Sequence, residues 1–145
     1  SILMMGETGL GKTHLSLSIA EEITRMGFVA MYSSALDLFR TLQNEYYGKG
    51  EQGKNTMQTI LQADLVIIDD LGAEFESQFN VSALYNIINS RLNVNKPIII
   101  STNLNSQQIE LKYSNRVASR VLTLYKCLKF VGKDIRQIKL KSNEL

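Results

Sequence analysis

Short apolar runs alternate along this chain with longer stretches in which apolar residues recur every three or four positions. Runs of strand length occupy residues 1–5, 28–34, 64–70 and 95–103. The unbroken apolar stretch from Leu65 to Ile68 is typical of a parallel strand that is covered on both faces. Pro97 stands near the start of its run, where a missing N–H is tolerated.

The intervening stretches have helical spacing. In the first of them Leu15, Ile19, Ile23 and Met26 lie on one helical face, and Gly27 follows where a helix is expected to end. Further helices are expected at residues 35–47, 56–63, 79–92 and 105–122, the last capped by Asn105 or Ser106, and residues 123–141 predict one or two edge strands. This alternation indicates an α/β domain with a mostly parallel sheet.

The composition limits the class of protein. With 145 residues, 44% hydrophobic and 21% charged, the chain has the make-up of one soluble globular domain. It contains no apolar run of membrane-spanning length and no signal-peptide pattern, so we expect a cytoplasmic protein with no membrane partner. Cys127 and His14 are the only residues of their types, which excludes a Cys/His cluster for structural zinc.

The net charge of +2 gives no overall polycation for nucleic-acid binding. Charge is nevertheless uneven, because residues 1–125 hold 10 Lys and Arg against 12 Asp and Glu, whereas residues 126–145 hold 6 against 2. This basic end is either a contact for phosphate backbones or a solvated terminus.

The stretch "GETGLGKT" fits the phosphate-binding pattern G-x-x-x-x-G-K-[ST] between a predicted strand and a predicted helix. Its glycines let backbone N–H groups face a polyphosphate at the start of the helix. We expect Lys12 to reach the β- and γ-phosphates of ATP, and the Thr13 hydroxyl to ligate Mg²⁺. The expected nucleotide-binding residues are Gly6, Glu7, Thr8, Gly9, Leu10, Gly11, Lys12, Thr13 and the adjoining His14.

Asp69 and Asp70 end the buried strand at residues 64–70. After a phosphate-binding loop, this is where such folds place a metal ligand and a group that polarises water, so we assign Asp69 to Mg²⁺ and Asp70 to the base. Aspartate is one methylene shorter than glutamate, which predicts slow turnover. Glu74 is a candidate for the missing reach, or else a solvated loop acid.

Two further elements carry candidate polar groups. Asn103 follows the next buried strand, where its amide is placed to orient a water molecule or sense a γ-phosphate. Arg116 and Arg120 are four residues apart and share one helical face. They are either solvated surface charges or an arginine finger that a neighbouring subunit supplies.

With "GETGLGKTHL", "LVIIDDLGAE", "IIISTN" and "NRVASRV" in this order, the chain resembles the AAA+ ATPases of the initiator and helicase-loader clade over nearly its whole length. It is similar to bacterial helicase loaders of the DnaC/DnaI type and to IstB-type transposition helper ATPases. The resemblance implies a P-loop NTPase fold, a three-layer α/β/α AAA+ domain with a mostly parallel five-stranded sheet.

The same resemblance implies roles for single residues. Gly6 to Thr13 correspond to Walker A, Asp69 and Asp70 to Walker B, and Asn103 to sensor one. Arg120 corresponds to the finger and Arg116 to its companion. Because a finger acts in trans, self-association into a ring or spiral is implied, together with a DnaB-type replicative helicase as partner.

Residues 35–63 resemble a helical insertion that lines a single-stranded DNA path in this family. In it, Phe39, Tyr46 and Tyr47 are candidates for base stacking, and Arg40, Lys49 and Lys54 for phosphate contacts. Packing in the core is the competing explanation for the aromatic residues.

The chain departs from the family pattern at both ends. Residues 126–145 are too few for a full helical lid, so we expect the lid to be absent or reduced, which puts a sensor-two role for Arg136 in doubt. The N-terminal partner-binding region of the family is also missing, and we expect residues 1–145 to be a single AAA+ domain from a longer protein.

These observations favour an ATP-dependent helicase loader that binds and slowly hydrolyses ATP, assembles, and grips single-stranded DNA. An IstB-type transposition helper has the same motifs. An ATP-controlled binding switch with little hydrolysis and a small-molecule kinase are the alternatives from other classes, the kinase requiring an acceptor pocket and an arginine-bearing closing segment.

Overall fold

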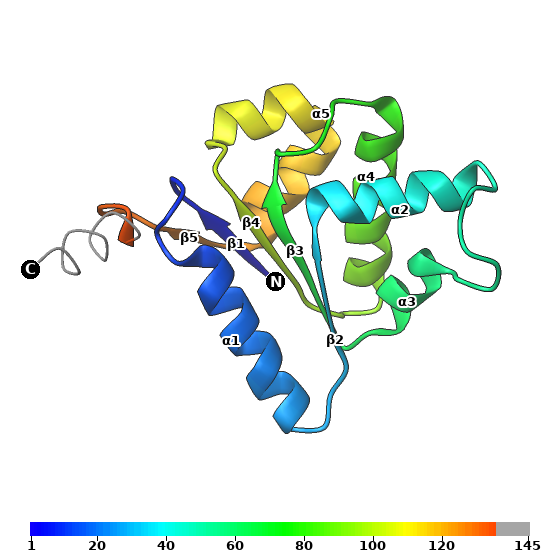
Figure 1. Cartoon of the computed structure of the whole chain (residues 1–145). Helices are drawn as coiled ribbons and strands as arrows, with labels where there is room; N and C mark the ends of the chain where they lie inside the picture. The colour runs from blue at the N-terminus through cyan, green and yellow to red at the C-terminus, as the bar shows by residue number, and fades with distance from the viewer. Residues whose placement is uncertain (136–145) are drawn as a thin grey trace, which may run out of the picture.

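The computed structural model describes residues 1–135, and its strands form one five-stranded parallel sheet (Figure 1). The strands are β1 (Ile2–Met5), β2 (Ala30–Ser34), β3 (Leu65–Leu71), β4 (Ile98–Thr102) and β5 (Lys126–Lys129). Their order across the sheet is β2-β3-β4-β1-β5, and every neighbouring pair is parallel. This confirms the predicted α/β class, the five-stranded sheet and the edge strand after residue 123.

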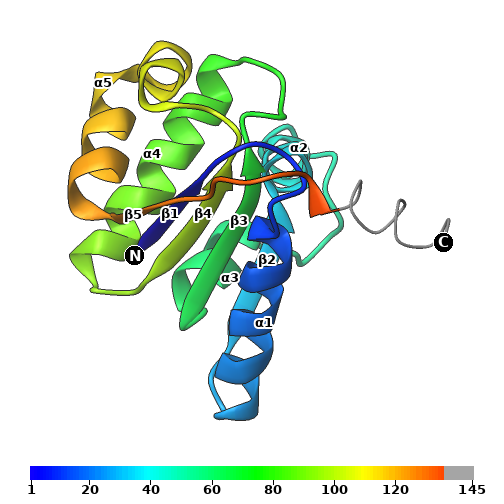
Figure 2. The same cartoon turned by 90° about the vertical axis from the view of Figure 1, so that its left-hand side faces the viewer.

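Five helices enclose the sheet: α1 (Lys12–Arg25), α2 (Ala35–Tyr46), α3 (Thr56–Gln62), α4 (Gln78–Asn93) and α5 (Ser106–Leu124). Helix α1 lies alone on one face, and the other four helices lie on the opposite face (Figures 1 and 2). The arrangement is the three-layer α/β/α architecture that the resemblance implied. Within residues 1–135, no helix is long and apolar enough to cross a membrane.

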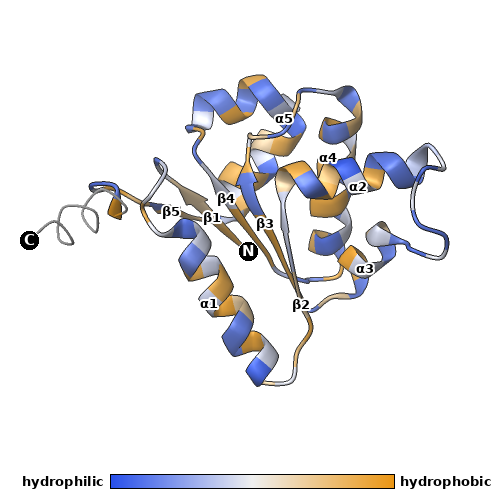
Figure 3. Ribbon diagram, viewed as in Figure 1, coloured by the Kyte–Doolittle hydropathy of each residue, from blue (hydrophilic) through white to orange (hydrophobic). Residues whose placement is uncertain are grey.

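The core is concentrated around strands β3 and β4. Most residues of these two strands are apolar (Figure 3). The larger apolar cluster lies between the sheet and helices α2 to α5. The smaller one, under α1, contains Met4, Leu65, Ile67 and Ile99. Because α1 covers its face alone, the predicted apolar side of this helix is only partly buried, and its Met26 is 63% exposed.

The strand order positions the candidate chemistry. Strand β4 lies between β1 and β3, so the loop after β1 and the aspartates of β3 flank the carboxyl end of β4. In open α/β sheets this edge, where the strand order reverses, is where ligands bind. Parallel pairing thus brings Thr13 to Asp69, 56 residues further along the chain, and Lys12 to Asn103, 91 residues further along.

Helix α5 contains a break that the sequence pattern did not predict. Its N-terminus is capped as expected, with the Asn105 side chain accepting from the Gln108 N–H and the Gln108 side chain from the Asn105 N–H. At Ser114, however, φ is 76° and ψ is 154°, which divides the helix. This backbone region is almost reserved for glycine and costs other residues about 1–3 kcal/mol.

We therefore expect Ser114→Gly to stabilise the fold by about 1 kcal/mol, because relief of the strain exceeds the extra backbone entropy of glycine. Urea unfolding followed by circular dichroism measures this change. Ser119→Gly is the matched control, since Ser119 lies exposed in the regular part of the same helix and should lose about 0.5–1 kcal/mol. Destabilisation by both substitutions would contradict the strain at Ser114.

Candidate active site

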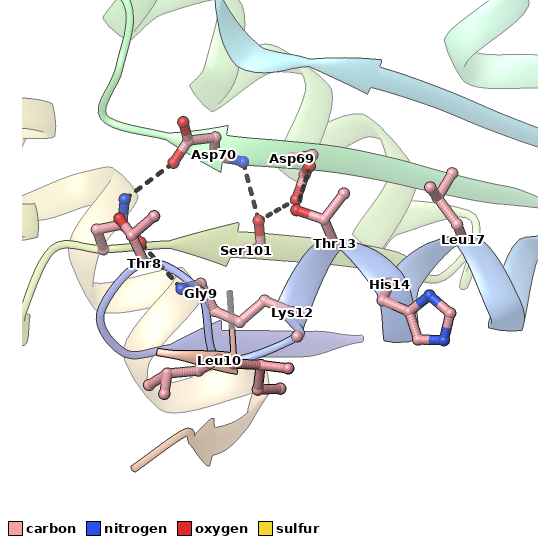
Figure 4. A pocket seen from close by; sticks show the side chains of 13 residues that line it. Thr8, Gly9, Leu10, Lys12, Thr13, His14, Leu17, Asp69, Asp70 and Ser101 are labelled. Carbon is pink, nitrogen blue, oxygen red and sulfur yellow. Dashed lines mark hydrogen bonds between the residues drawn. The ribbon is translucent and has the colours of Figure 1, made fainter. Parts of the chain in front are cut away.

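A pocket of about 570 Å³ opens at the carboxyl edge of the sheet (Figure 4). Its lining comes from the loop after β1, the start of α1, the end of β3 and the end of β4, together with Ile135, which follows β5. This volume is within the range of cofactor-sized sites. The pocket is therefore formed by the same segments whose motifs predicted nucleotide binding.

The loop before α1 has the backbone geometry that its glycines predicted. Gly9 and Gly11 have φ values of 79° and 89°, in the left-handed region, and Gly11 directly precedes α1 with no side-chain cap. The N-terminal N–H groups of α1 therefore face the pocket as donors for an anion. A Cβ atom at Gly9 would lie 2.0 Å from a carboxylate oxygen of Asp134, so a side chain there would displace that of Asp134.

Lys12 is held against the loop by three hydrogen bonds. Its Nζ donates to the carbonyl oxygens of Gly6 (2.6 Å) and Glu7 (2.7 Å) and to Oδ1 of Asn103 (2.9 Å). The side chain is buried, and this burial lowers the pKa of Lys12, an effect that the charges of Asp70 and Asp69 oppose. The ammonium group thus lies inside the pocket beside the two candidate carboxylates.

Asp69 accepts hydrogen bonds from three hydroxyl groups and is 5% exposed. Thr13 Oγ1 and Tyr32 OH donate to Oδ2 over 2.9 and 2.7 Å, and Ser101 Oγ donates to Oδ1. Burial, with the hydrogen bond to Asp69, raises the pKa of Tyr32 to about 12, so the phenol remains a donor at neutral pH.

The pair Thr13 and Asp69 fits Mg²⁺. Both are hard oxygen ligands, and no cluster of three or more His, Cys, Asp or Glu suited to a metal occurs in residues 1–135. Magnesium in nucleotide sites is commonly held by one or two protein groups, with phosphates and water completing its coordination. The donor set therefore fits a Mg²⁺ ion that is held together with a nucleotide.

Asp70 has a left-handed backbone, with φ at 55°. Its N–H donates to Ser101 Oγ (2.9 Å), and its carboxylate accepts from Asn103 Nδ2 (3.1 Å). Since Asn103 also accepts from Lys12, the three side chains form one hydrogen-bonded series across the pocket. The structure thus brings together the Walker A lysine, the second aspartate and the candidate sensor.

Other predicted site residues lie apart from this series. His14 lines the pocket but points away from the aspartates (Figure 4). Glu7 lines a smaller neighbouring pocket. Glu74 is 4% exposed, lines neither pocket, and accepts from the Gly72 N–H and the Tyr113 hydroxyl. Its carboxylate fixes the loop after β3 to α5, so neither alternative weighed for it, added reach for Asp70 or a solvated acid, describes its position.

Arg116 and Arg120 do not line the pocket. The guanidinium of Arg120 lies 4.7 Å from the centre of the Tyr85 ring and donates to the Tyr85 hydroxyl (3.2 Å) and to the Arg116 carbonyl (3.1 Å). Among the residues that line the pocket within the described chain there is no arginine. A guanidinium for this site would have to come from elsewhere.

The candidate DNA contacts are divided by burial. Phe39 is 2% exposed and packs in the core, so the competing explanation is right and Phe39 is removed from the candidates. Tyr46 and Tyr47 are 72% and 62% exposed, with ring centres 5.2 Å apart, edge to face. Tyr46 also contacts Phe79 of α4, which extends this aromatic surface beyond α2.

The basic candidates are also exposed. Arg40 pairs with Asp37 (2.9 Å) and Lys54 with Glu51 (2.5 Å), both at the surface, and Lys49 is exposed in the loop before α3. Arg136 lies outside the described residues. The helix–loop–helix arrangement predicted for residues 35–63 is confirmed by α2 and α3.

The sequence patterns did not predict two residues that donate hydrogen bonds to Asp69, Tyr32 and Ser101. Ser101 connects the two aspartates through one hydroxyl, and its position two residues before Asn103 at a strand end was a usable signal. Tyr32 lies on a different strand, β2, and nothing in the local sequence connects it to Asp69.

Residues 1–123 match the model of the family described as IstB-like ATP binding protein. Over 121 residues the chain is 23% identical to the replicative helicase loader DnaC of Escherichia coli (strain K12), covering 83% of this chain and 49% of the relative. It is 33% identical over 110 residues to the phage-like element PBSX protein XkdC of Bacillus subtilis (strain 168), covering 72% of this chain and 40% of that protein. The chain thus spans about half the length of the curated relatives it matches, or less.

Solved structures share the fold. The crystal structure of the DnaC helicase loader superposes with a TM-score of 0.75 at 24% identity, covering 90% of this chain and 77% of that one. The AMPPCP-bound DnaA of Aquifex aeolicus superposes with a TM-score of 0.79 at 23% identity, covering 99% of this chain and 46% of that one. The three-layer α/β/α fold is therefore that of AAA+ P-loop proteins.

Proposed function

Because the chain belongs to the IstB-like ATP binding protein family, we propose that it is the ATPase domain of a cytoplasmic DNA replication helicase loader. The family and the fold make the chain an AAA+ nucleotide-binding unit of the DnaC type. Slow hydrolysis, assembly, binding of single-stranded DNA and contact with a DnaB-type replicative helicase are the proposal.

The observation that carries the ATPase function is the hydrogen-bonded series Lys12–Asn103–Asp70 beside the Thr13–Asp69 pair. In the proposed mechanism, the loop N–H groups and Lys12 bind the β- and γ-phosphates of ATP. Thr13 and Asp69 would hold Mg²⁺, which neutralises phosphate charge. Asp70 and Asn103 orient the attacking water, and the short aspartate keeps turnover slow.

No arginine lines the pocket within residues 1–135, which supports assembly. Arg120 lies on α5 against Tyr85 and does not line the pocket of its own chain, as expected of a residue that acts in a neighbouring copy. We propose that Arg120 is the finger, with Arg116 on the same helical face, and that subunits form a ring or spiral. For single-stranded DNA, Tyr46 and Tyr47 supply exposed rings for stacking, and Arg40, Lys49 and Lys54 supply phosphate contacts.

The test is ATP hydrolysis per subunit across a series of protein concentrations, with and without single-stranded DNA. If the site is shared, specific activity should rise with concentration and fall about 10³-fold in Arg120→Ala, because a finger contributes this much to phosphoryl transfer. Arg40→Ala is the matched control in assays without DNA, since it removes an exposed arginine distant from the pocket. A flat concentration series that ignores Arg120 would instead favour an ATP-controlled switch.

The partner needs a separate test, because an IstB-type transposition helper would have the same site. The full-length protein should retain the replicative helicase in a pull-down with ATP and lose it with Lys12→Ala. Retention of a transposase and not of the helicase would reverse the assignment within the family.

A further inference from the structure

Tyr32 connects an exposed edge of the sheet to the most buried carboxylate of the pocket. Its strand, β2, is at one end of the sheet, and its side chain is 39% exposed, whereas Asp69 is 5% exposed. The phenol donates to Asp69 Oδ2 over 2.7 Å. No motif of the phosphate-binding loop or of the strand ends includes this residue.

The register of β2 and β3 explains why a tyrosine reaches Asp69. Tyr32 is directly opposite Ile67, and Ser34 is directly opposite Asp69. The Ser34 hydroxyl is engaged elsewhere, because it caps α2 by accepting from the Asp37 N–H and donates to the Asp37 carboxylate. Tyr32 lies two residues before the position opposite Asp69. Adjacent strands are about 4.8 Å apart and two residues rise about 6.6 Å, so the diagonal distance is about 8 Å, which a phenol can span and a small side chain cannot.

The three hydroxyls occupy most of the Asp69 carboxylate. A carboxylate offers about four lone-pair positions. Thr13 and Tyr32 take the two at Oδ2, and Ser101 takes one at Oδ1. One lone-pair position at Oδ1 is left. Rotation of the carboxylate would break at least one of the three hydrogen bonds. Tyr32 and Ser101 hold it from opposite sides, one from β2 and one from β4.

We propose that Tyr32 is a positioning residue for the magnesium site, which holds the Asp69 carboxylate in the orientation that serves Mg²⁺–ATP. The inference rests on the proposed ATPase function, because it assigns Asp69 to the metal. Tyr32 acts only through Asp69, so its removal should change the dependence of nucleotide binding on Mg²⁺ and leave metal-free binding as it is.

The experiment measures affinity for a fluorescent, non-hydrolysable ATP analogue in Mg²⁺ and in EDTA. For Tyr32→Phe we expect the gain in affinity that Mg²⁺ provides to fall about tenfold, as is usual when the partner of a metal ligand is lost. Affinity in EDTA should be unchanged. Tyr125→Phe is the matched control, because Tyr125 directly precedes β5, at the opposite end of the strands from the pocket.

Further variants separate the possible outcomes. Ser101→Ala and Tyr32→Phe should combine non-additively in the Mg²⁺-dependent affinity, because both orient one carboxylate. Equal weakening in Mg²⁺ and EDTA, with a lower urea midpoint, would make Tyr32 merely structural and overturn the inference. If Asp69→Asn abolishes the Mg²⁺ effect while Tyr32→Phe does not, the inference fails and the ATPase function stands. If Asp69→Asn has no effect, the proposed metal site itself fails.

Discussion

Arg91→Met is expected to destabilise the fold by about 3–5 kcal/mol, a large part of the stability of a typical domain. Arg91 is completely buried in α4, and its guanidinium donates to four backbone carbonyls. They belong to Ile60 (2.5 Å), Ala63 (2.9 Å), Asp64 (3.1 Å) and Pro97 (2.8 Å). Methionine fills much of the volume but removes the donor from the carbonyls of Ile60, Ala63 and Asp64, and each buried acceptor left unpaired costs about 1–3 kcal/mol. The Pro97 carbonyl keeps the Val66 N–H as a donor.

The measurement is the urea midpoint at constant m-value, read by circular dichroism. Arg25→Met is the matched control, since Arg25 forms exposed ion pairs with Glu21 and Glu22, which contribute at most about 1 kcal/mol. If Arg91→Met does not fold, Arg91→Lys keeps the charge with fewer, differently directed donors and should lose an intermediate amount. Equal losses at Arg91 and Arg25 would contradict the role given to the four carbonyls.

Arg91 also shows how far the apolar pattern of the sequence can be used. Leu84, Ile88 and Arg91 follow the i, i+4, i+7 spacing of one helical face, so the pattern itself places Arg91 on the buried side. The positive charge of arginine favours an exposed position instead, and the residue type alone does not decide between the buried and the exposed position. What decides is a set of four carbonyl groups from α3, the loop before β3 and the residue before β4, which come together only in the folded chain.

The strands and the phosphate-binding loop were predictable because their signals are local. A continuous run such as residues 65–68 specifies a buried parallel strand wherever it is placed. A Gly-rich loop before a helix likewise carries its own geometry. The positions of Asp69, Asp70 and Asn103 followed from the rule that parallel strands end at the same edge of a sheet.

Features that depend on register or on backbone strain were not predictable. The hydrogen bond from Tyr32 to Asp69 requires the pairing of β2 with β3, which no short segment encodes. The break at Ser114 occurs in a sequence with neither glycine nor proline to indicate it. The sequence allowed two interpretations of Phe39, base stacking or burial in the core, and only the packing of its helix against the sheet decides for burial.

Lys12→Ala is expected to lower ATP hydrolysis by at least about 100-fold, because a preorganised donor to developing phosphate charge contributes about 10²–10³ to the rate. The loss has a second component in this chain. Lys12 Nζ also holds Asn103 Oδ1, and Asn103 in turn donates to the Asp70 carboxylate. Removing the lysine should therefore release the group proposed to orient water, as well as the phosphate contact.

Single-turnover hydrolysis with saturating ATP separates these components, because saturation compensates for weaker binding. Asn103→Ala alone should give the smaller loss, and adding it to Lys12→Ala should cost little more, since both act in one series. Lys126→Ala is the matched control, because Lys126 is exposed at the start of β5, at the end of the sheet opposite the pocket. Strictly additive losses at Lys12 and Asn103 would show that the two side chains act independently, and the hydrogen bond between them would then have no part in hydrolysis.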